Sequence, residues 1–234
     1  MSLPPVAILA GGLATRLYPV TQTIPKSLVE VAGKPFIVHQ LERLRQQGIT
    51  RVVLCVGNLG DQIVELLGNG QTYDLDIQYS FDGPALRGTG GAIQQALPLL
   101  DGTFFVLYGD SYLQCDYRAL DAFFHQSSSL GVMTVFRNEG QWDKSNIIFK
   151  DGLIVTYDKH QHLPEMHYID YGLSLLKGEI FRSTPVGQAF DLADVYRQLV
   201  REKQMAGFEV TTRFYEIGSH DGLAETRAYL EHPK

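Results

Sequence analysis

Short runs of apolar residues, each followed by a segment with helical periodicity, constrain the fold of this 234-residue chain most strongly. Residues 6–10 form one such run and stop at a pair of glycines, and residues 104–108 form another that stops at Gly-Asp. A short apolar run without polar interruption is typical of a strand that is buried on both faces. Because strands of this kind alternate with helices up to about residue 136, the sequence predicts right-handed crossovers and a largely parallel sheet.

The remaining elements follow from hydrophobic period and from the positions of glycine and proline. In chain order we expect helices and strands as follows: a helix at 35–48, a strand at 51–56, a helix at 61–67, a strand at 77–79, a helix at 91–100, a hairpin of 146–150 and 153–157, a strand at 169–176, a helix at 192–202, a strand at 213–217 and a terminal helix. This order predicts a Rossmann-like α/β fold, with three α/β/α layers around a mostly parallel mixed central sheet. We find no internal repeat and no linker, so residues 1–234 are expected to form a single domain.

The composition narrows the class of protein. Hydrophobic residues make up 44% of the chain and charged residues 20%, which suits a folded core better than disorder. The net charge is -6 and the lysines and arginines are scattered, so we expect no nucleic-acid partner. No apolar run reaches the length of a membrane span, and the two cysteines, Cys55 and Cys115, lack metal or redox spacing. We therefore expect a cytoplasmic protein with reduced thiols and no membrane contact, and a homo-oligomer stays open.

The segment that follows the first strand carries the clearest chemical signal. Gly11 and Gly12 allow backbone N–H groups to approach a phosphate, because no Cβ stands in the way. Arg16 can bind two phosphate oxygens at once, and Lys26 adds a compact positive charge after a proline-stiffened loop. The spacing fits neither the P-loop nor the dinucleotide GxGxxG pattern. The segment therefore predicts a phosphate-binding loop of another kind.

This segment resembles the signature of the sugar-1-phosphate nucleotidylyltransferases, and the resemblance continues in order along nearly the whole chain. Within the family, the heptose-1-phosphate and mannose-1-phosphate guanylyltransferases are the most similar. The motifs that carry the resemblance are Gly11-Gly12 with Thr15-Arg16-Leu17, Pro25-Lys26, Gly33-Lys34-Pro35, Arg87-Gly88-Thr89-Gly90-Gly91-Ala92, Gly109-Asp110 and Tyr215-Glu216-Ile217-Gly218-Ser219.

The resemblance implies the fold of the nucleotide-diphospho-sugar transferases and a set of site residues. It implies a nucleotide-binding half at about 1–136 and an acceptor-binding half at about 137–234. Arg16 and Lys26 would be catalytic, and Asp110 and Glu216 would hold Mg²⁺. The expected nucleotide contacts are Leu9, Ala10, Gly11, Gly12, Thr15, Asp82, Gly88 and Thr89, and the expected sugar-phosphate contacts are Gly109, Asn146, Lys159 and Asp170.

The chain departs from the family pattern at several of these positions. Glu216 stands where the family usually has Asp, so it either reaches the metal, directly or through a water, or pairs with a nearby cation instead. Lys159 lies in Asp158-Lys159-His160, where the family has Glu-Lys-Pro. Ser145 and Asn146 stand at the place of a family glycine. Asp170 stands where the family has an amide residue. These changes concern the identity of the acceptor rather than the presence of an acceptor site.

The implied reaction transfers a nucleoside monophosphate from a nucleoside triphosphate to a sugar 1-phosphate and releases pyrophosphate. GTP with a heptose or mannose 1-phosphate is the leading pair, and Asp82 either accepts hydrogen bonds from guanine or caps a turn. Alternatives are UTP, dTTP or CTP as donor, or a non-catalytic nucleotide-sugar-binding subunit. A phosphocholine acceptor held in an aromatic cage of Trp142, Tyr168 and Tyr171 is a further alternative. The histidines at 160, 162 and 167 are expected in a solvated loop rather than a zinc site.

Overall fold

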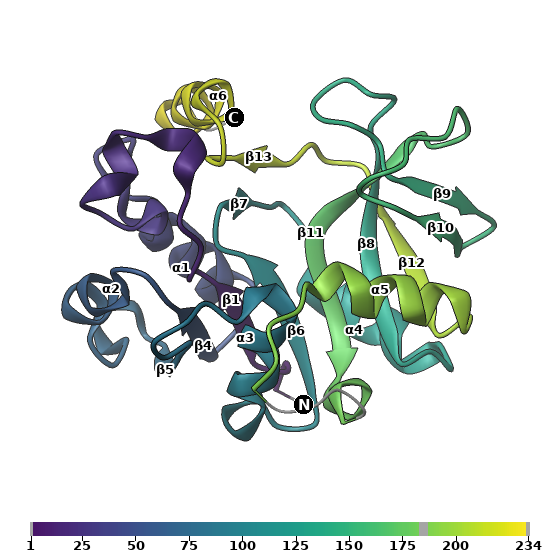
Figure 1. Ribbon diagram of the computed structural model, residues 1–234, viewed down its shortest axis with the longest axis horizontal. Coiled ribbons are helices and arrows are strands. Elements are labelled where there is room, and N and C mark those ends of the chain that lie inside the picture. Colours follow the sequence, from purple (N-terminus) through teal and green to yellow (C-terminus); the bar gives the residue numbers. More distant parts are fainter. Residues whose placement is uncertain (1, 183–186, 233–234) are drawn as a thin grey trace.

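A nine-stranded mixed sheet runs through the part of the chain that the computed structural model describes, residues 2–182 and 187–232 (Figure 1). Its strand order is β5-β4-β1-β6-β11-β8-β12-β10-β9. The first four strands in this order pair in parallel, as the sequence predicts: β5 (Asp76–Phe81), β4 (Arg51–Val56), β1 (Val6–Leu9) and β6 (Thr103–Tyr108). Their carboxyl ends meet at one edge, which is where open α/β sheets bind ligands.

The second half of the sheet changes direction. β11 (Tyr168–Lys177) lies antiparallel between β6 and β8 (Gly131–Arg137), and β12 (Met205–Val210) runs parallel to β8. The antiparallel β11 therefore joins the parallel half of the sheet to a second group of strands.

The outer edge of the sheet is the predicted hairpin, formed by β9 (Ile147–Lys150) and β10 (Leu153–Tyr157). Its turn residues Asp151 and Gly152 have φ angles of 51° and 78°. Positive φ at both central residues is the requirement of the favoured two-residue hairpin turn. Two small antiparallel pairs stand apart from the main sheet: β2 (Glu30–Val31) with β3 (Lys34–Pro35), and β7 (Ser111–Tyr112) with β13 (Tyr215–Glu216).

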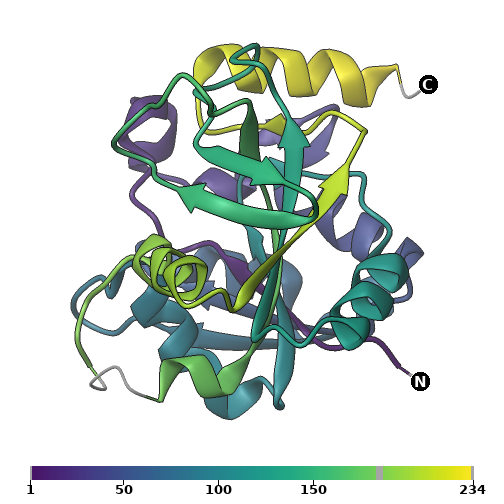
Figure 2. The same cartoon turned by 90° about the vertical axis from the view of Figure 1, so that its right-hand side faces the viewer.

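Helices cover both faces of the sheet, which gives the predicted three layers. Figure 2 shows α4 and α5 on opposite sides of it, and Figure 1 shows α6 beyond the carboxyl ends of the parallel strands. One face carries α1 (Phe36–Gln46), α2 (Gly60–Leu67) and α4 (Tyr117–Gln126), the other α3 (Gly88–Ala96) and α5 (Leu192–Arg201), and the chain ends in α6 (His220–Glu231). No described helix combines the length and the apolar character that crossing a bilayer requires.

Alternate residues of the buried strands divide the core into two parts. Val6 and Ile8 of β1 face the α1, α2 and α4 side, whereas Ala7 faces the α3 and α5 side. This period of two explains why an apolar run without polar gaps marks a central strand. Cys55 and Cys115 are free and buried, as predicted, and burial raises the pKa of each thiol to about 12.

Two predicted elements need correction, and one strand near them is not predicted. The helix expected at 91–100 begins at Gly88 and ends at Ala96, because Pro98 shortens it into a 3₁₀ turn and the glycines pack against residues 190–192. The strand expected at 213–217 is only Tyr215–Glu216. The main strand of that region, β12, is not predicted at all.

Candidate active site

The loop after β1 and the turn after β6 meet at the carboxyl edge of the sheet. Leu9 and Tyr108 are register partners at the ends of these parallel strands, and Gly109 donates its N–H to the Leu9 carbonyl at 3.0 Å. A Cβ at Gly109 would lie 2.5 Å from that same carbonyl oxygen. Only glycine permits this approach, which brings Asp110 next to the glycine loop.

A cavity of about 220 Å³ opens at this edge and contains most of the predicted nucleotide contacts. Among the described residues, Thr15 is the predicted contact that lines neither this cavity nor the second one described below, since it lies exposed in the 3₁₀ turn Thr15–Leu17. The residues that line the first cavity are Leu9, Ala10, Gly11, Gly12, Lys26, Ser27, Cys55, Asp82, Leu86, Gly88, Thr89, Ala92, Tyr108, Gly109 and Asp110.

Asp82 is the buried acid of this cavity, with 6% of its surface exposed. Burial raises the pKa of its carboxyl group, while the nearby Arg87 opposes that shift. The Arg87 side chain donates to the backbone carbonyl of Asp82 at 2.8 Å, and the backbone N–H of Arg87 donates to the Asp82 carboxylate. The carboxylate therefore bonds the turn that follows β5 and at the same time lines the cavity.

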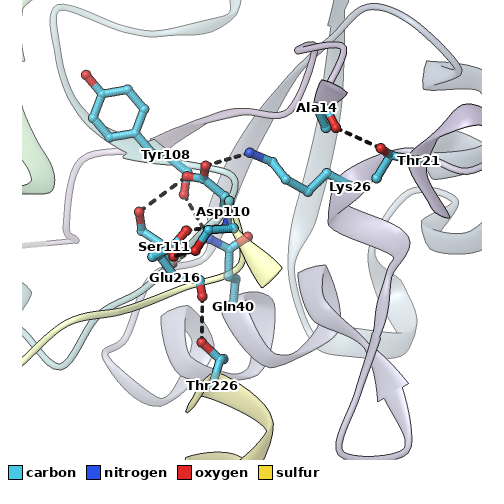
Figure 3. A network of polar contacts seen from close by, with 11 residues as sticks. Ala14, Thr21, Lys26, Gln40, Tyr108, Asp110, Ser111, Glu216 and Thr226 are labelled. Carbon is cyan, nitrogen blue, oxygen red and sulfur yellow. Dashed lines mark hydrogen bonds and ion pairs between the residues drawn. The ribbon is translucent and has the colours of Figure 1, made fainter. Parts of the chain in front are cut away.

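Lys26 and Asp110 form an ion pair where the glycine loop meets the turn after β6 (Figure 3). The Nζ atom lies 2.6 Å from Oδ2 of Asp110. Gln40 of α1 holds the turn after β6, because its amide donates to the carbonyls of Tyr108 at 3.0 Å and Ser111 at 2.8 Å. These contacts set the carboxylate of Asp110 in a defined position.

Glu216 reaches the same place from β13. Ile217 donates its N–H to the Asp110 carbonyl at 2.9 Å, so the two backbones run side by side. The Glu216 carboxylate turns toward the start of α6, where it accepts hydrogen bonds from the Ser219 hydroxyl at 2.6 Å and from the Gly218 N–H. The longer side chain is therefore accommodated by the N-terminus of a helix, which favours negative charge.

Gly218 marks a small cradle between the charged groups. A Cβ built there would lie 3.1 Å from Oδ2 of Asp110, 2.7 Å from Oε2 of Glu216 and 3.4 Å from Nη2 of Arg16. Within residues 2–182 and 187–232, no three His, Cys, Asp or Glu side chains gather as a complete metal cage. Two carboxylates beside an open space suit Mg²⁺, which takes one or two carboxylates and completes its shell with phosphates and water.

A second cavity of about 410 Å³ adjoins the first and contains most of the predicted acceptor contacts. Tyr108 and Asp110 line both cavities, whereas Arg16 lines the second and Gly109 the first. The second cavity is lined by Arg16, Tyr108, Asp110, Ser111, Trp142, Asp143, Asn146, Lys159, Ile169, Asp170, Tyr171, Gly172, Phe214, Glu216 and Ser219.

The charge of Lys159, which lines this cavity, acts on two acidic groups: Asp170 of the same cavity and Asp191 at the start of α5. Burial raises the pKa of Asp170, and Lys159 opposes that rise. Burial would also raise the pKa of Asp191, but the N–H of Ala193 and the charge of Lys159 lower it overall. Thr89 donates to Asp191 at 2.9 Å, so its hydroxyl is engaged with the start of α5 although it lines the nucleotide cavity.

Several cavity residues were not predicted from the sequence, and the aromatic cage considered for a phosphocholine acceptor does not form. Tyr108 directly precedes the motif Gly109-Asp110, and Gly218 and Ser219 lie within the motif of Glu216, but none of the three was assigned to the site. The aromatic cage is wrong, because Tyr168 packs on Phe149 and bonds Glu209 instead of facing the cavity with Trp142. The histidines at 160, 162 and 167 are exposed, as predicted.

Comparison with known proteins gives the class. Residues 6–146 match the nucleotidyl transferase family. The chain is 34% identical to N-acetylmuramate alpha-1-phosphate uridylyltransferase of Neisseria meningitidis, over 94% of this chain and 96% of that protein. It is 30% identical to mannose-1-phosphate guanyltransferase 2 of Candida glabrata, over 96% of this chain but only 64% of that longer protein.

Solved structures agree with the fold. A Bacillus anthracis protein crystallised with a sucrose superposes with a TM-score of 0.87 at 21% identity, over 98% of this chain and 96% of that one. The chain therefore belongs to the nucleotidyl transferase family, which confirms the resemblance drawn from its motifs. It is an enzyme, a nucleotidyltransferase with the nucleotide-diphospho-sugar transferase fold.

Proposed function

We propose that the protein uses GTP and a hexose or heptose 1-phosphate, with Mg²⁺ as its cofactor. The coarser activity follows from the family and its relatives: a nucleoside monophosphate passes from a nucleoside triphosphate to a sugar 1-phosphate, and pyrophosphate is released. The observation that carries the proposal is the meeting of two cavities at Asp110, with Lys26 paired to it. One cavity suits the donor and the other the acceptor. We also assign the enzyme to the cytoplasm, because nucleoside triphosphates are available there.

The chemistry at the junction requires charge and position rather than a base. A phosphate monoester has its second pKa near about 6, so the attacking oxygen is already ionised at neutral pH. In-line attack on the α-phosphorus then depends on alignment and on positive charge around the transition state. Lys26 would contact the α-phosphate, and Arg16, beside Gly218, would neutralise phosphate charge on the other side of Asp110.

The two carboxylates at Gly218 are the groups that would hold Mg²⁺, Asp110 directly and Glu216 directly or through a water. When bound, the ion would supply positive charge that stabilises the transferred phosphate group. Lys159 would bind the acceptor phosphate, and Asn146 and Asp170 would meet the sugar hydroxyls. The amide oxygen of Asn146 already accepts the Asp170 N–H at 3.0 Å, which orders this part of the cavity.

Asp82 supports guanine as the base. An ionised carboxylate has about four acceptor positions, so Asp82 can accept the N1–H and the N2–H of guanine in addition to the backbone N–H of Arg87. Uracil offers a single N–H, so it would occupy only one of these positions. A second candidate is UTP with N-acetylmuramate 1-phosphate, which the 34% identity along nearly the whole Neisseria relative favours.

Pyrophosphate release tests the proposal. The four common ribonucleoside triphosphates and dTTP are each combined with mannose, heptose, glucose and N-acetylmuramate 1-phosphates, with and without Mg²⁺. We expect the highest kcat/KM for GTP with mannose or heptose 1-phosphate, and no turnover without a divalent ion. A preference for UTP with N-acetylmuramate 1-phosphate would replace the donor and the acceptor that we propose.

A further inference from the structure

Trp142, the only tryptophan of the chain, stands between two hollows of the surface. It lines the acceptor cavity, and it also lines an outer groove of about 610 Å³ formed by residues 140–145 and His162. Trp142 and Asp143 are the residues that both hollows share. The indole is 43% exposed, as expected of a ring that forms a partition rather than part of the core.

Arg213 holds the indole ring from the side of β13 and α6. Its guanidinium carbon lies 3.4 Å from the centroid of the Trp142 ring and 4.8 Å from that of Tyr215. The same guanidinium pairs with Glu225 of α6. A planar guanidinium stacked on an indole is the favoured cation–π geometry, and the ion pair with α6 restrains it further.

Hydrogen bonds through Asn138 make the segment that carries Trp142 a rigid wall. Asn138 is 1% exposed, and its amide nitrogen donates to the Asp143 carbonyl at 2.6 Å and to the Ser145 hydroxyl at 3.2 Å. Its amide oxygen accepts the N–H of Trp142 at 3.3 Å. One buried side chain thus fixes the backbone on both sides of the indole, so this segment cannot move away from the cavity without breaking these bonds.

We propose that Trp142 determines which sugars the acceptor cavity admits, with Arg213 as the positioning residue that holds it. The inference rests on the proposed function. The indole closes the acceptor cavity toward the outer groove, so a pyranose 1-phosphate fits while a bulky ring substituent on that side is excluded. Replacing the ring with a methyl group joins the two hollows and makes room for such a substituent.

The decisive measurement is a ratio of kcat/KM values for two acceptors, mannose 1-phosphate and a bulkier 2-acetamido-hexose 1-phosphate, with the preferred nucleoside triphosphate. We expect Trp142→Ala to shift this ratio toward the bulkier acceptor by at least about tenfold, the scale on which pockets discriminate small groups. Trp142→Phe, which keeps an aromatic wall, and Leu66→Ala, an exposed control on α2, should keep the wild-type ratio. Arg213→Gln should shift the ratio in the same direction as Trp142→Ala but by less.

The fluorescence of the lone tryptophan gives an independent reading. Titration of the wild-type protein with mannose 1-phosphate should change the emission of Trp142, and Arg213→Gln should alter the emission before any ligand is added. If the ratio is unchanged in a folded Trp142→Ala protein, Trp142 does not set specificity, and this inference fails alone. If the wild-type protein turns over no acceptor at all, the proposed function fails. If titration with mannose 1-phosphate leaves the emission of Trp142 unchanged, the inference is overturned too.

Discussion

The ammonium nitrogen of Lys26 lies 2.6 Å from Oδ2 of Asp110, although 84 residues separate them in the chain. Each side chain is about one quarter exposed or less, so each charge is compensated mainly by the other. The pair joins the 3₁₀ turn Lys26–Leu28 to the turn after β6. It therefore brings the group proposed for the α-phosphate and the group proposed for the metal to one point.

Lys26→Ala should lower kcat/KM for pyrophosphate release by at least about a hundredfold, because a positive contact to the transition state is lost. The effect on thermal stability should be small, since a partly exposed ion pair contributes at most about 1 kcal/mol. Lys150→Ala, at the exposed end of β9, serves as the matched control and should behave like the wild type. Undiminished turnover by a folded Lys26→Ala protein would exclude the role proposed for this lysine.

Asp110→Asn should keep the fold and abolish metal-dependent activity, because a neutral amide is a poor ligand for a hard cation. Isothermal titration of Mg²⁺ in the presence of GTP measures the change directly, and we expect the Mg²⁺ affinity to fall at least about tenfold. Asp151→Asn is a suitable control, since Asp151 lies in an exposed hairpin turn at positive φ, where asparagine is tolerated. Unchanged Mg²⁺ affinity in Asp110→Asn would move the metal to other residues.

Substitutions at Glu216 and Gly222 should have coupled effects on stability, because the two residues lie in contact. A Cβ at Gly222 would lie 1.6 Å from Oε1 of Glu216, so Gly222→Ala must displace the carboxylate or the first turn of α6. Alanine usually stabilises a helix interior relative to glycine by about 1 kcal/mol, yet here we expect destabilisation of roughly 1–3 kcal/mol. Adding Glu216→Ala should reverse the loss, which chemical denaturation of the two single variants and the double variant would reveal. Additive effects would mean that the contact has no energetic weight.

Glu216 should affect the choice of metal as well. Glu216→Asp should change the ratio of Mn²⁺-supported to Mg²⁺-supported activity while keeping substantial turnover, because Mg²⁺ requires a stricter geometry than Mn²⁺. Glu216→Gln keeps the length but removes the charge, and we expect lower initial rates with both ions. Wild-type rates for Glu216→Gln with both ions would make this residue a cap of α6 only.

The features that could be predicted from the sequence are those that depend on neighbouring residues. The bounds of β4 and the hairpin turn at Asp151-Gly152 follow from local apolar runs and turn chemistry, and so does the parallel half of the sheet. Strand β12 escaped prediction because its glycine, Gly207, is required by a distant ring: a Cβ there would lie 2.4 Å from Phe149. No local pattern contains that contact.

The site, too, has residues that the local sequence predicts and residues that depend on contacts between distant segments. The glycine loop and Asp110 could be identified because each follows a buried strand, and parallel neighbours end at one edge. The contact between Trp142 and Arg213 could not be predicted, because it joins a loop to the segment before β13 across 70 intervening residues. The position of Arg16 on the acceptor side of Asp110 likewise depends on how the loop after β1 folds back, which its composition does not fix.

Asp82 offers the last test, because its proposed role in binding should carry a cost in stability. Burial raises the pKa of this carboxyl group in the folded protein. The folded state therefore binds the proton more tightly than the unfolded chain, whose Asp pKa is about 3.9. Between the unfolded and folded pKa values the folded state holds more protons, so this group's contribution to stability falls as the pH rises through its folded pKa.

Asp82→Asn removes the ionised form and its cost. We expect the Tm of Asp82→Asn to exceed that of the wild type at pH 7, and the difference to disappear as the pH falls below about 4. The same variant should bind GTP at least about tenfold more weakly, since a carboxylate that accepts two guanine N–H groups is replaced by an amide that cannot. Asp76→Asn, at an exposed position of β5, should change neither the pH profile nor the affinity for GTP. Thermal melts from pH 8 down to below about pH 4 and GTP titrations of the three proteins test both expectations. A lower Tm for Asp82→Asn at pH 7 would mean that the carboxylate stabilises the fold, and full GTP affinity would remove it from the base site.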